Sequence, residues 1–326
     1  MLVADAKILK RFPTFSQARC CRQNYSQCQG AKVMPKRSRN VAILEGMMAG
    51  TLFGTAAILI RYLTGVSVFS IAFWRLIVAS VIFALILLAT GKSFEWDPIR
   101  RDVGQIAVLG ILLGLHFILF VSAVMDTTII NATVLVNTTA IWSMFVSSLV
   151  FGLKPSRTAL LGILLSFVGV AIITYGDASS GTWTVQLRGD LEAVLAAVVE
   201  SFYLSYGKGA RRKAPLMPLM MGIYIFSTIT VIAIGVVTQQ SLAPPVEWGQ
   251  ILPLIGLGIL PTAMAHTFYF SSLSHLKSFE TAAMALLEPV GATLLGFVIF
   301  QQVPGPLFAL GAALVLTGIV AVAMRE

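Results

Sequence analysis

Long stretches without any charged residue dominate this chain. Residues Thr127–Leu153 and Ala214–Val246 contain no Asp, Glu, Lys or Arg, and each is longer than the about 20 apolar residues that a helix needs to cross a bilayer. Only 11% of the 326 residues are charged, whereas soluble domains carry about 25%. So few charges could not cover the surface of a soluble globule. The sequence therefore predicts a polytopic membrane protein and excludes a soluble enzyme, a disordered protein and a disulfide scaffold.

Positive charge is concentrated at the N-terminus. The first 40 residues hold nine Lys and Arg residues against one acid, Asp5. Because this basic run ends where the first apolar stretch begins at Val41, we interpret it as the cytoplasmic flank of a span rather than as a nucleic-acid-binding segment. Residues 1–40 are predicted to be a disordered cytoplasmic tail. All three cysteines lie there, so no disulfide is expected in the membrane core. Met34 begins a compact basic leader, MPKRSRN, where we expect translation to start.

Ten spanning helices fit the distribution of apolar residues. We place them near residues 41–61, 69–90, 104–125, 128–151, 158–176, 190–208, 217–238, 249–272, 279–300 and 305–324. With the N-terminus inside, the inner loops carry 11 Lys and Arg residues and the outer loops only Arg61 and Arg188. This bias follows the positive-inside rule. We therefore predict a multi-pass protein of the cytoplasmic (inner) membrane with both termini in the cytoplasm.

The chain also repeats itself. At an offset of 149, residues 151–170 match residues 300–319 at six positions, where about one or two are expected by chance. The LEG motif at 44–46 returns as LEA at 191–193, at an offset of 147. Each half contains five spans, an odd number, so the second half enters the membrane from the opposite side. We predict an all-α membrane protein of ten transmembrane helices, built as two inverted five-helix repeats.

Four segments of the two halves share a recognisable pattern. They are AGTLFGTAAILIR at 49–61, WRLIVAS at 74–80, ETAAMALLEPVGATLLGFVIF at 280–300 and ALGAALVLTGIVAV at 309–322. Together they resemble the EamA-like family of the drug/metabolite transporter superfamily, whose recurrent Leu-Glu-Pro-Val stretch is similar to the one around 288–289. The chain departs from the family at 152–153 and 301–302, where Gly-Leu and Gln-Gln replace a frequent Gly-Glu. The resemblance implies an inner-membrane carrier of small metabolites, often an exporter.

The repeat and the resemblance together predict four parts of the chain. They are the tail at 1–40, a first five-span EamA-like repeat at 41–176, an external linker at 177–188 and a second five-span EamA-like repeat at 189–326.

Five ionisable side chains are predicted to lie well inside the membrane, where a charge costs roughly 2.5–3.5 kcal/mol and usually marks function. Glu288, Glu200 and His116 are predicted to couple transport to a proton or another ion. Arg75 and His266 are assigned to substrate binding. Structural roles are the alternatives: a carboxylate paired with a helix end or with Arg75, an ion pair that holds the fold, or neutral histidines in the core.

Uncharged polar and aromatic residues complete the predicted site. Asn137 and Trp142 in the fourth span, Tyr203 in the sixth and Tyr269 in the eighth are assigned to substrate binding. Tying helices together or filling the core are the alternatives. Tyr203 lies three residues after Glu200 on the same helix face, which brings its hydroxyl within reach of that carboxylate.

Motifs for catalysis are missing from the sequence. No HExxH, GxGxxG or GxSxG pattern occurs, and the P-loop-like Gly-Lys-Ser at 91–93 lacks its first glycine. We therefore expect no enzyme activity, no cofactor and no metal site.

The predicted function is secondary active transport of a small metabolite by alternating access around a midplane site. An amino acid or a drug-like cation is favoured as the substrate, and export is the preferred direction. A membrane-embedded enzyme and a passive channel are the alternatives. The expected partners are the small-molecule substrate, the lipid bilayer and coupling protons, without nucleic acid. The fifth and tenth spans are expected to buttress the two halves or to form a homodimer.

Overall fold

The computed structural model describes residues 38–89, 100–127, 129–152, 155–178, 187–300 and 307–323. Residues Ser38–Glu326 form one compact unit, and the part of it that is described is helical, with no strand. The predicted tail lies outside the described residues except for positions 38–40, and so does most of the predicted linker at 177–188.

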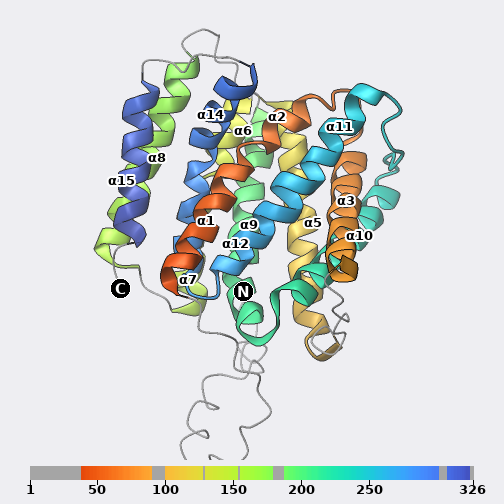
Figure 1. Cartoon of the computed structure of the whole chain (residues 1–326), viewed down its shortest axis with the longest axis horizontal. Helices are drawn as coiled ribbons and strands as arrows, with labels where there is room; N and C mark the ends of the chain where they lie inside the picture. The colour runs from red at the N-terminus through yellow and green to blue at the C-terminus, as the bar shows by residue number, and fades with distance from the viewer. Residues whose placement is uncertain are drawn as a thin grey trace, which may run out of the picture. The chain divides into compact units, whose positions relative to one another are not determined.

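The described residues form ten helical segments (Figure 1). They are α1 (Arg39–Phe53) with α2 (Ala56–Arg61), α3 (Val68–Ala89), α5 (Val103–Asp126), α6 (Ile129–Val136) with α7 (Thr139–Phe151), α8 (Arg157–Ala178), α9 (Leu187–Lys213), α10 (Leu216–Val237), α11 (Trp248–Leu257) with the π-helical η3 (Gly258–Ala265) and α12 (His266–Ser272), α13 (Ser278–Met284) with the 3-10 turn η4 (Ala285–Leu287) and α14 (Glu288–Phe300), and α15 (Phe308–Ala323). The segments coincide with the ten predicted spans to within a few residues.

The helices have the composition of a membrane bundle. Within the described part of the chain, six segments are long and apolar enough to cross a bilayer, and two further helices contain the shorter apolar stretches Arg157–Ile172 and Phe308–Val322. Large apolar side chains such as Leu149 and Val237, each 82% exposed, point outward, while charged side chains such as Arg75 are buried. This distribution suits a lipid environment rather than water. The predicted fold class, an all-α membrane protein, is confirmed.

The two halves of the bundle make equivalent contacts. α1 in the first half packs against α12, α13 and α14 of the second, and α9 in the second half packs against α5, α6 and α7 of the first. At opposite ends of the bundle, Arg61 donates a hydrogen bond to the carbonyl of Thr127, and Lys208 donates one to the carbonyl of Leu276 at 2.9 Å. The offsets of 147 and 149 found in the sequence relate these two pairs. An inverted repeat produces this pseudo-twofold relation.

α8 and α15 stand side by side at one side of the bundle (Figure 1). Their small residues face each other: a Cβ atom on Gly162 would lie 2.6 Å from the carbonyl oxygen of Gly318. Ser166 donates a hydrogen bond to the carbonyl of Val315 at 3.0 Å. The glycine faces of these two spans are therefore used within the chain, where they join the two halves.

Several helices are broken near their centres. α1 and α2 are separated at Gly54 and Thr55, α6 and α7 at Asn137 and Thr138, and the second half contains the π-helical η3 and the 3-10 turn η4. Pro261 lies inside η3, and Pro289 follows η4, where a missing N–H weakens the regular helix. Broken helices at the same depth expose backbone and polar side chains to a common interior site.

Candidate functional site

A cavity lies between the two halves, where the broken helices meet. Its lining residues are Phe53, Ala56, Arg75, His116, Phe117, Phe120, Val136, Asn137, Thr139, Glu200, His266, Ala285 and Glu288. Six of the nine residues predicted for the site are among them: Arg75, His116, Asn137, Glu200, His266 and Glu288. The ionisable groups that the sequence places at mid-membrane therefore converge on one place, although they come from five different spans.

Glu288 and Asn137 join the two halves across this cavity. The Nδ2 atom of Asn137 donates a hydrogen bond to Oε2 of Glu288 at 3.1 Å and another to the carbonyl of Thr133 at 2.8 Å. Both side chains are buried. Asn137 lies at the break between α6 and α7, and Glu288 is the first residue of α14, so each helix interruption delivers one partner of the bond.

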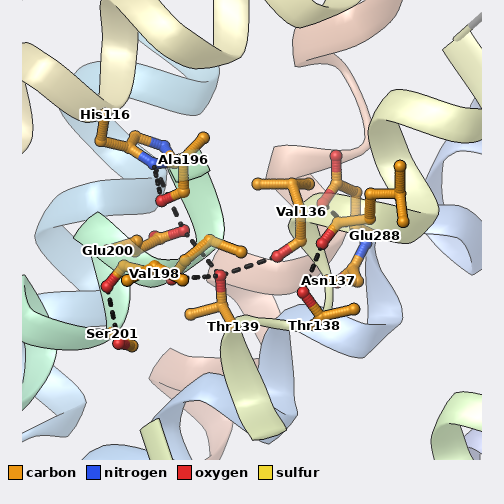
Figure 2. Close-up of polar contacts among 12 residues, drawn as sticks. His116, Val136, Asn137, Thr138, Thr139, Ala196, Val198, Glu200, Ser201 and Glu288 are labelled. Carbon is orange, nitrogen blue, oxygen red and sulfur yellow. Dashed lines mark hydrogen bonds and ion pairs between the residues drawn. The ribbon is translucent and has the colours of Figure 1, made fainter. Parts of the chain in front are cut away.

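Glu200 lies on the other side of the same helix break. Its Oε2 atom lies 3.4 Å from Oγ1 of Thr139 and 3.7 Å from Nδ1 of His116. That ring nitrogen is also 3.1 Å from the carbonyl of Ala196. The Thr139 hydroxyl also has the carbonyl of Val136 as a closer acceptor, at 2.7 Å. Figure 2 shows Thr139 between the His116–Glu200 pair and the Asn137–Glu288 pair. Asn137 and Thr139 lie in the same turn of chain, and each contacts one of the two carboxylates, Glu288 and Glu200.

Arg75 is buried, with 1% of its surface exposed. Its Nε atom donates to Oγ1 of Thr262 at 2.9 Å, and its guanidinium lies 3.9 Å above the ring of Phe117. Among the described residues, its Nη1 atom has no hydrogen-bond partner, and no carboxylate forms an ion pair with the side chain. These contacts therefore do not include the ion pair that was the structural alternative for Arg75.

His266 closes the cavity from the second half. Its ring packs edge-on against Phe53, Phe117 and His116, at centroid distances of 4.9, 5.0 and 6.2 Å. Nδ1 of His266 is buried and has no hydrogen-bond partner in the described part of the chain. The two histidines therefore face each other from opposite halves beside an aromatic wall.

Three predicted residues lie elsewhere. Tyr203 and Tyr269 are fully buried but do not line the cavity. The hydroxyl of Tyr203 has no hydrogen-bond partner among the described residues, so the contact with Glu200 that the sequence allows is not made, and Thr139 takes that place. Trp142 is 37% exposed and packs beside Phe145, away from the other site residues.

Sequence reasoning missed several cavity residues. Thr139 lies two positions after Asn137 in a charge-free span, and this polar cluster at mid-membrane was the available signal. Phe53, Phe117 and Phe120 give no signal of their own, because phenylalanine suits a lipid-facing surface as well as a cavity wall.

The profile of the EamA-like transporter family matches this chain twice, over residues 40–175 and 187–324. The chain belongs to this family. The two matches confirm the predicted architecture of two repeats, and this EamA-like protein is a membrane transporter. Family membership is consistent with the expectation that it is not an enzyme.

Individual relatives agree with this assignment. The protein named "Uncharacterized transporter YxxF" of Bacillus subtilis (strain 168) is 22% identical over 294 residues, which cover 89% of this chain and 92% of that protein. A "Probable terminal-alkyne amino-acid exporter" of Streptantibioticus cattleyicolor is 23% identical over 275 residues, covering 81% and 86%. A protein solved by crystallography has the same fold, with a TM-score of 0.71, 21% identity and coverage of 88% of this chain and 100% of the other.

Proposed function

We propose that this EamA-like transporter exports a small amino acid across the cytoplasmic membrane by proton-driven alternating access. The observation that carries the proposal is the guanidinium of Arg75, which has no carboxylate partner among the described residues although it shares the cavity with Glu200 and Glu288. A buried cation without an anionic partner is costly. A substrate carboxylate bound to Nη1 of Arg75 supplies that partner, and arginine is suited to hold a carboxylate with two hydrogen bonds.

The charges of the cavity also suit an ammonium group. With both carboxylates ionised and the histidines neutral, the lining has one negative charge in excess. An amino acid places its carboxylate on Arg75 and its ammonium on Glu288. In the absence of the substrate, protons take the place of the ammonium group on Glu288 and on the neighbouring carboxylate, Glu200. Because a proton and an ammonium group compete for the same carboxylates, protonation from one side releases the substrate there, which couples the two fluxes.

The aromatic part of the lining favours an apolar substrate side chain. Phe53, Phe117 and Phe120 face the cavity beside the charged groups. Burial of apolar surface contributes about 25 cal/mol per Å², so an amino acid with an apolar side chain gains from this wall.

The orientation and the direction of transport complete the proposal. The end of the bundle that carries Arg39, Lys208 and Lys277, here called the basic end, is placed in the cytoplasm because short cytoplasmic loops are enriched in Lys and Arg. Export is supported by the relative from Streptantibioticus cattleyicolor, which is named a "Probable terminal-alkyne amino-acid exporter".

Uptake by proteoliposomes with an imposed pH gradient tests the proposal. We expect the wild type to accumulate an apolar amino acid, and Arg75→Gln to lose this transport while it still carries the corresponding amino-acid amide, which lacks the carboxylate. Arg188→Gln is the matched control, because the Arg188 side chain is 79% exposed at a helix end. Undiminished amino-acid transport by Arg75→Gln, or an unchanged flux in the Glu288→Gln, Glu200→Gln double variant, would overturn the proposal.

A further inference from the structure

Buried hydroxyl groups lead from the central cavity toward the basic end of the bundle. On α7, Thr139, Ser143 and Ser147 follow at intervals of four residues and so share one helix face. Each is at most 2% exposed. Facing helices add further hydroxyls, and the group as a whole, here called the hydroxyl seam, consists of Thr139, Ser143, Ser147, Tyr203, Ser205, Tyr269, Ser272, Ser278 and Thr281.

Hydrogen-bond contacts occur near both ends of the seam. At the cavity, Oγ1 of Thr139 lies 3.4 Å from Oε2 of Glu200. Further down, the hydroxyls of Ser147 and Ser278 are 2.5 Å apart, and Ser205 donates to Ser278 at 3.2 Å. These contacts join α7, α9 and α13 in the interior. The seam thus links helices of both halves with groups that both donate and accept hydrogen bonds.

Charged residues lie where the seam reaches the basic end. Two residues after Ser278, Glu280 accepts a hydrogen bond from the backbone N–H of Lys277 at 2.7 Å and forms an ion pair with Arg39 at 3.2 Å. Lys208 lies three residues after Ser205 and bonds the carbonyl of Leu276. Charged side chains therefore lie close in sequence to the last hydroxyls of the seam, at the basic end of the bundle.

Three seam hydroxyls are left without a partner. Ser143, Tyr203 and Tyr269 are fully buried, and their hydroxyl oxygens make no hydrogen bond to any described residue. An unsatisfied hydroxyl in a membrane interior is costly. Groups of this kind are normally satisfied by water, which forms about three hydrogen bonds in a polar interior site. Each of these three hydroxyls therefore still has a hydrogen bond to offer to water.

The inverted repeat supplies an internal comparison. The seam runs from the cavity to the basic end. The pseudo-twofold relation maps it onto positions that lead from the cavity to the opposite end of the bundle. With the offsets of 149 and 147, Ser278 corresponds to Ile129, Thr281 to Ala132, Ser272 to Ala123, Tyr269 to Phe120, Ser205 to Ile58 and Tyr203 to Ala56. Each of these six hydroxyls is replaced by an apolar side chain, and several of the replacements belong to one buried apolar cluster. The fold therefore does not require hydroxyls at these positions.

We propose that the hydroxyl seam conducts protons between the central carboxylates and the cytoplasm. The inference rests on the proposed function for the role of these protons. A proton leaves the Glu200 carboxyl group, each hydroxyl or bound water accepts one proton and passes one on, and the last proton enters the cytoplasm at the Glu280 end. No bond other than O–H bonds changes. Apolar packing between the cavity and the opposite end of the bundle blocks proton exchange with the outside in this conformation.

Hydrogen–deuterium exchange of the central carboxyl groups tests the seam directly. Infrared spectra of the purified protein in D₂O follow the carboxyl C=O band that disappears in the Glu200→Gln, Glu288→Gln variant. We expect this band to shift several-fold more slowly in the triple variant Ser147→Ala, Ser205→Ala, Ser278→Ala. The matched control is Thr228→Val, which removes a part-buried hydroxyl of α10 outside the seam. Ser278→Thr keeps a hydroxyl and is expected to keep the wild-type rate.

An exchange rate in the triple variant equal to that of the wild type would overturn the inference, as would the absence of any such band from the wild type. Transport assays separate this result from the proposed function. We expect the triple variant to retain amino-acid counterflow, which needs no net proton movement, and to lose uptake driven by a pH gradient several-fold. If exchange is slower in the triple variant but amino-acid transport by the wild type does not depend on the pH gradient, proton conduction by the seam is supported and the proposed proton coupling is contradicted.

Discussion

Asn137 donates a hydrogen bond to Glu288 at 3.1 Å, and this bond joins the first repeat to the second at the centre of the bundle. Both residues lie at helix interruptions, 151 positions apart in the sequence. The repeat-related spans therefore meet through their broken centres, where a polar contact is protected from lipid on all sides.

Asn137→Ala is expected to weaken substrate binding. The change removes a hydrogen bond to a buried carboxylate, a contact worth about 1.5–3 kcal/mol, and so loses roughly 10- to 100-fold in affinity. Binding of a radiolabelled amino acid to purified protein measures the effect. Gln250→Ala, which removes an exposed side chain bonded to the carbonyl of Thr64, is expected to bind as the wild type does. Equal affinity of Asn137→Ala and wild type would contradict the role given to this amide.

Thr139→Val is expected to impair proton coupling without changing the shape of the cavity. The substitution removes the hydroxyl that bonds Glu200 at 3.4 Å, a contact of about 0.5–1.5 kcal/mol. We expect roughly a two- to tenfold loss of uptake driven by a pH gradient, with counterflow retained. Thr138→Val is the neighbouring control, because its hydroxyl bonds the carbonyl of Leu135. Equal losses in the two variants would point to helix stability instead.

His116→Gln is expected to flatten the pH dependence of transport. The imidazole Nδ1 lies 3.7 Å from Glu200, and an imidazole can accept and donate a proton, whereas the amide of glutamine cannot. The initial rate of uptake, measured across pH values at constant substrate concentration, reports the change. His275→Gln is the control, since that ring contacts the adjacent Ser274 at an exposed position. An unaltered pH profile in His116→Gln would exclude His116 from proton coupling.

Two contacts at opposite ends of the bundle are expected to hold the cavity closed. Glu280 pairs with Arg39 at the basic end, and Asp190 accepts hydrogen bonds from Thr127 and Asn131 at the other end, at 2.7 and 3.2 Å. Glu280→Gln weakens only the first contact.

We expect Glu280→Gln to raise the rate at which a membrane-impermeant thiol reagent labels Ser205→Cys, in a background without the three native cysteines. Asp190→Asn is the matched substitution at the far end and is expected to leave that rate unchanged. Faster labelling in both variants would show a general loosening of the bundle rather than two separate closures.

Gly318→Val is expected to destabilise the pairing of α8 with α15. A Cβ atom at this position would lie 2.2 Å from Oγ of Ser166 and 2.4 Å from the carbonyl oxygen of Gly162. Overpacking of this kind costs about 1–3 kcal/mol, so the melting temperature in detergent is expected to fall. At Gly249 a Cβ atom would meet nothing within 4 Å, and Gly249→Ala is expected to melt close to the wild type. An unchanged melting temperature for Gly318→Val would show that the two helices separate at little cost.

The scarcity of charge made most of the candidate site predictable. A charge inside a bilayer is expensive, so Arg75, Glu200 and Glu288 stood out, and all three line the cavity. Trp142 was assigned by its depth alone, but it faces outward. Depth in the membrane follows from position along a span, whereas direction around the helix axis does not, because lipid and protein interior both accept an apolar side chain.

The sequence alone determined the number and limits of the helices and their division into two inverted repeats. These features follow from hydropathy, from charge-free runs and from the offset of 149, each of which is a property of the linear chain. The tertiary structure decided which polar groups meet. Asn137 reaches Glu288, and Thr139 rather than Tyr203 reaches Glu200, because the helices are interrupted and rotated by their packing. Packing between distant spans sets these angles, and no local pattern in the sequence encodes them.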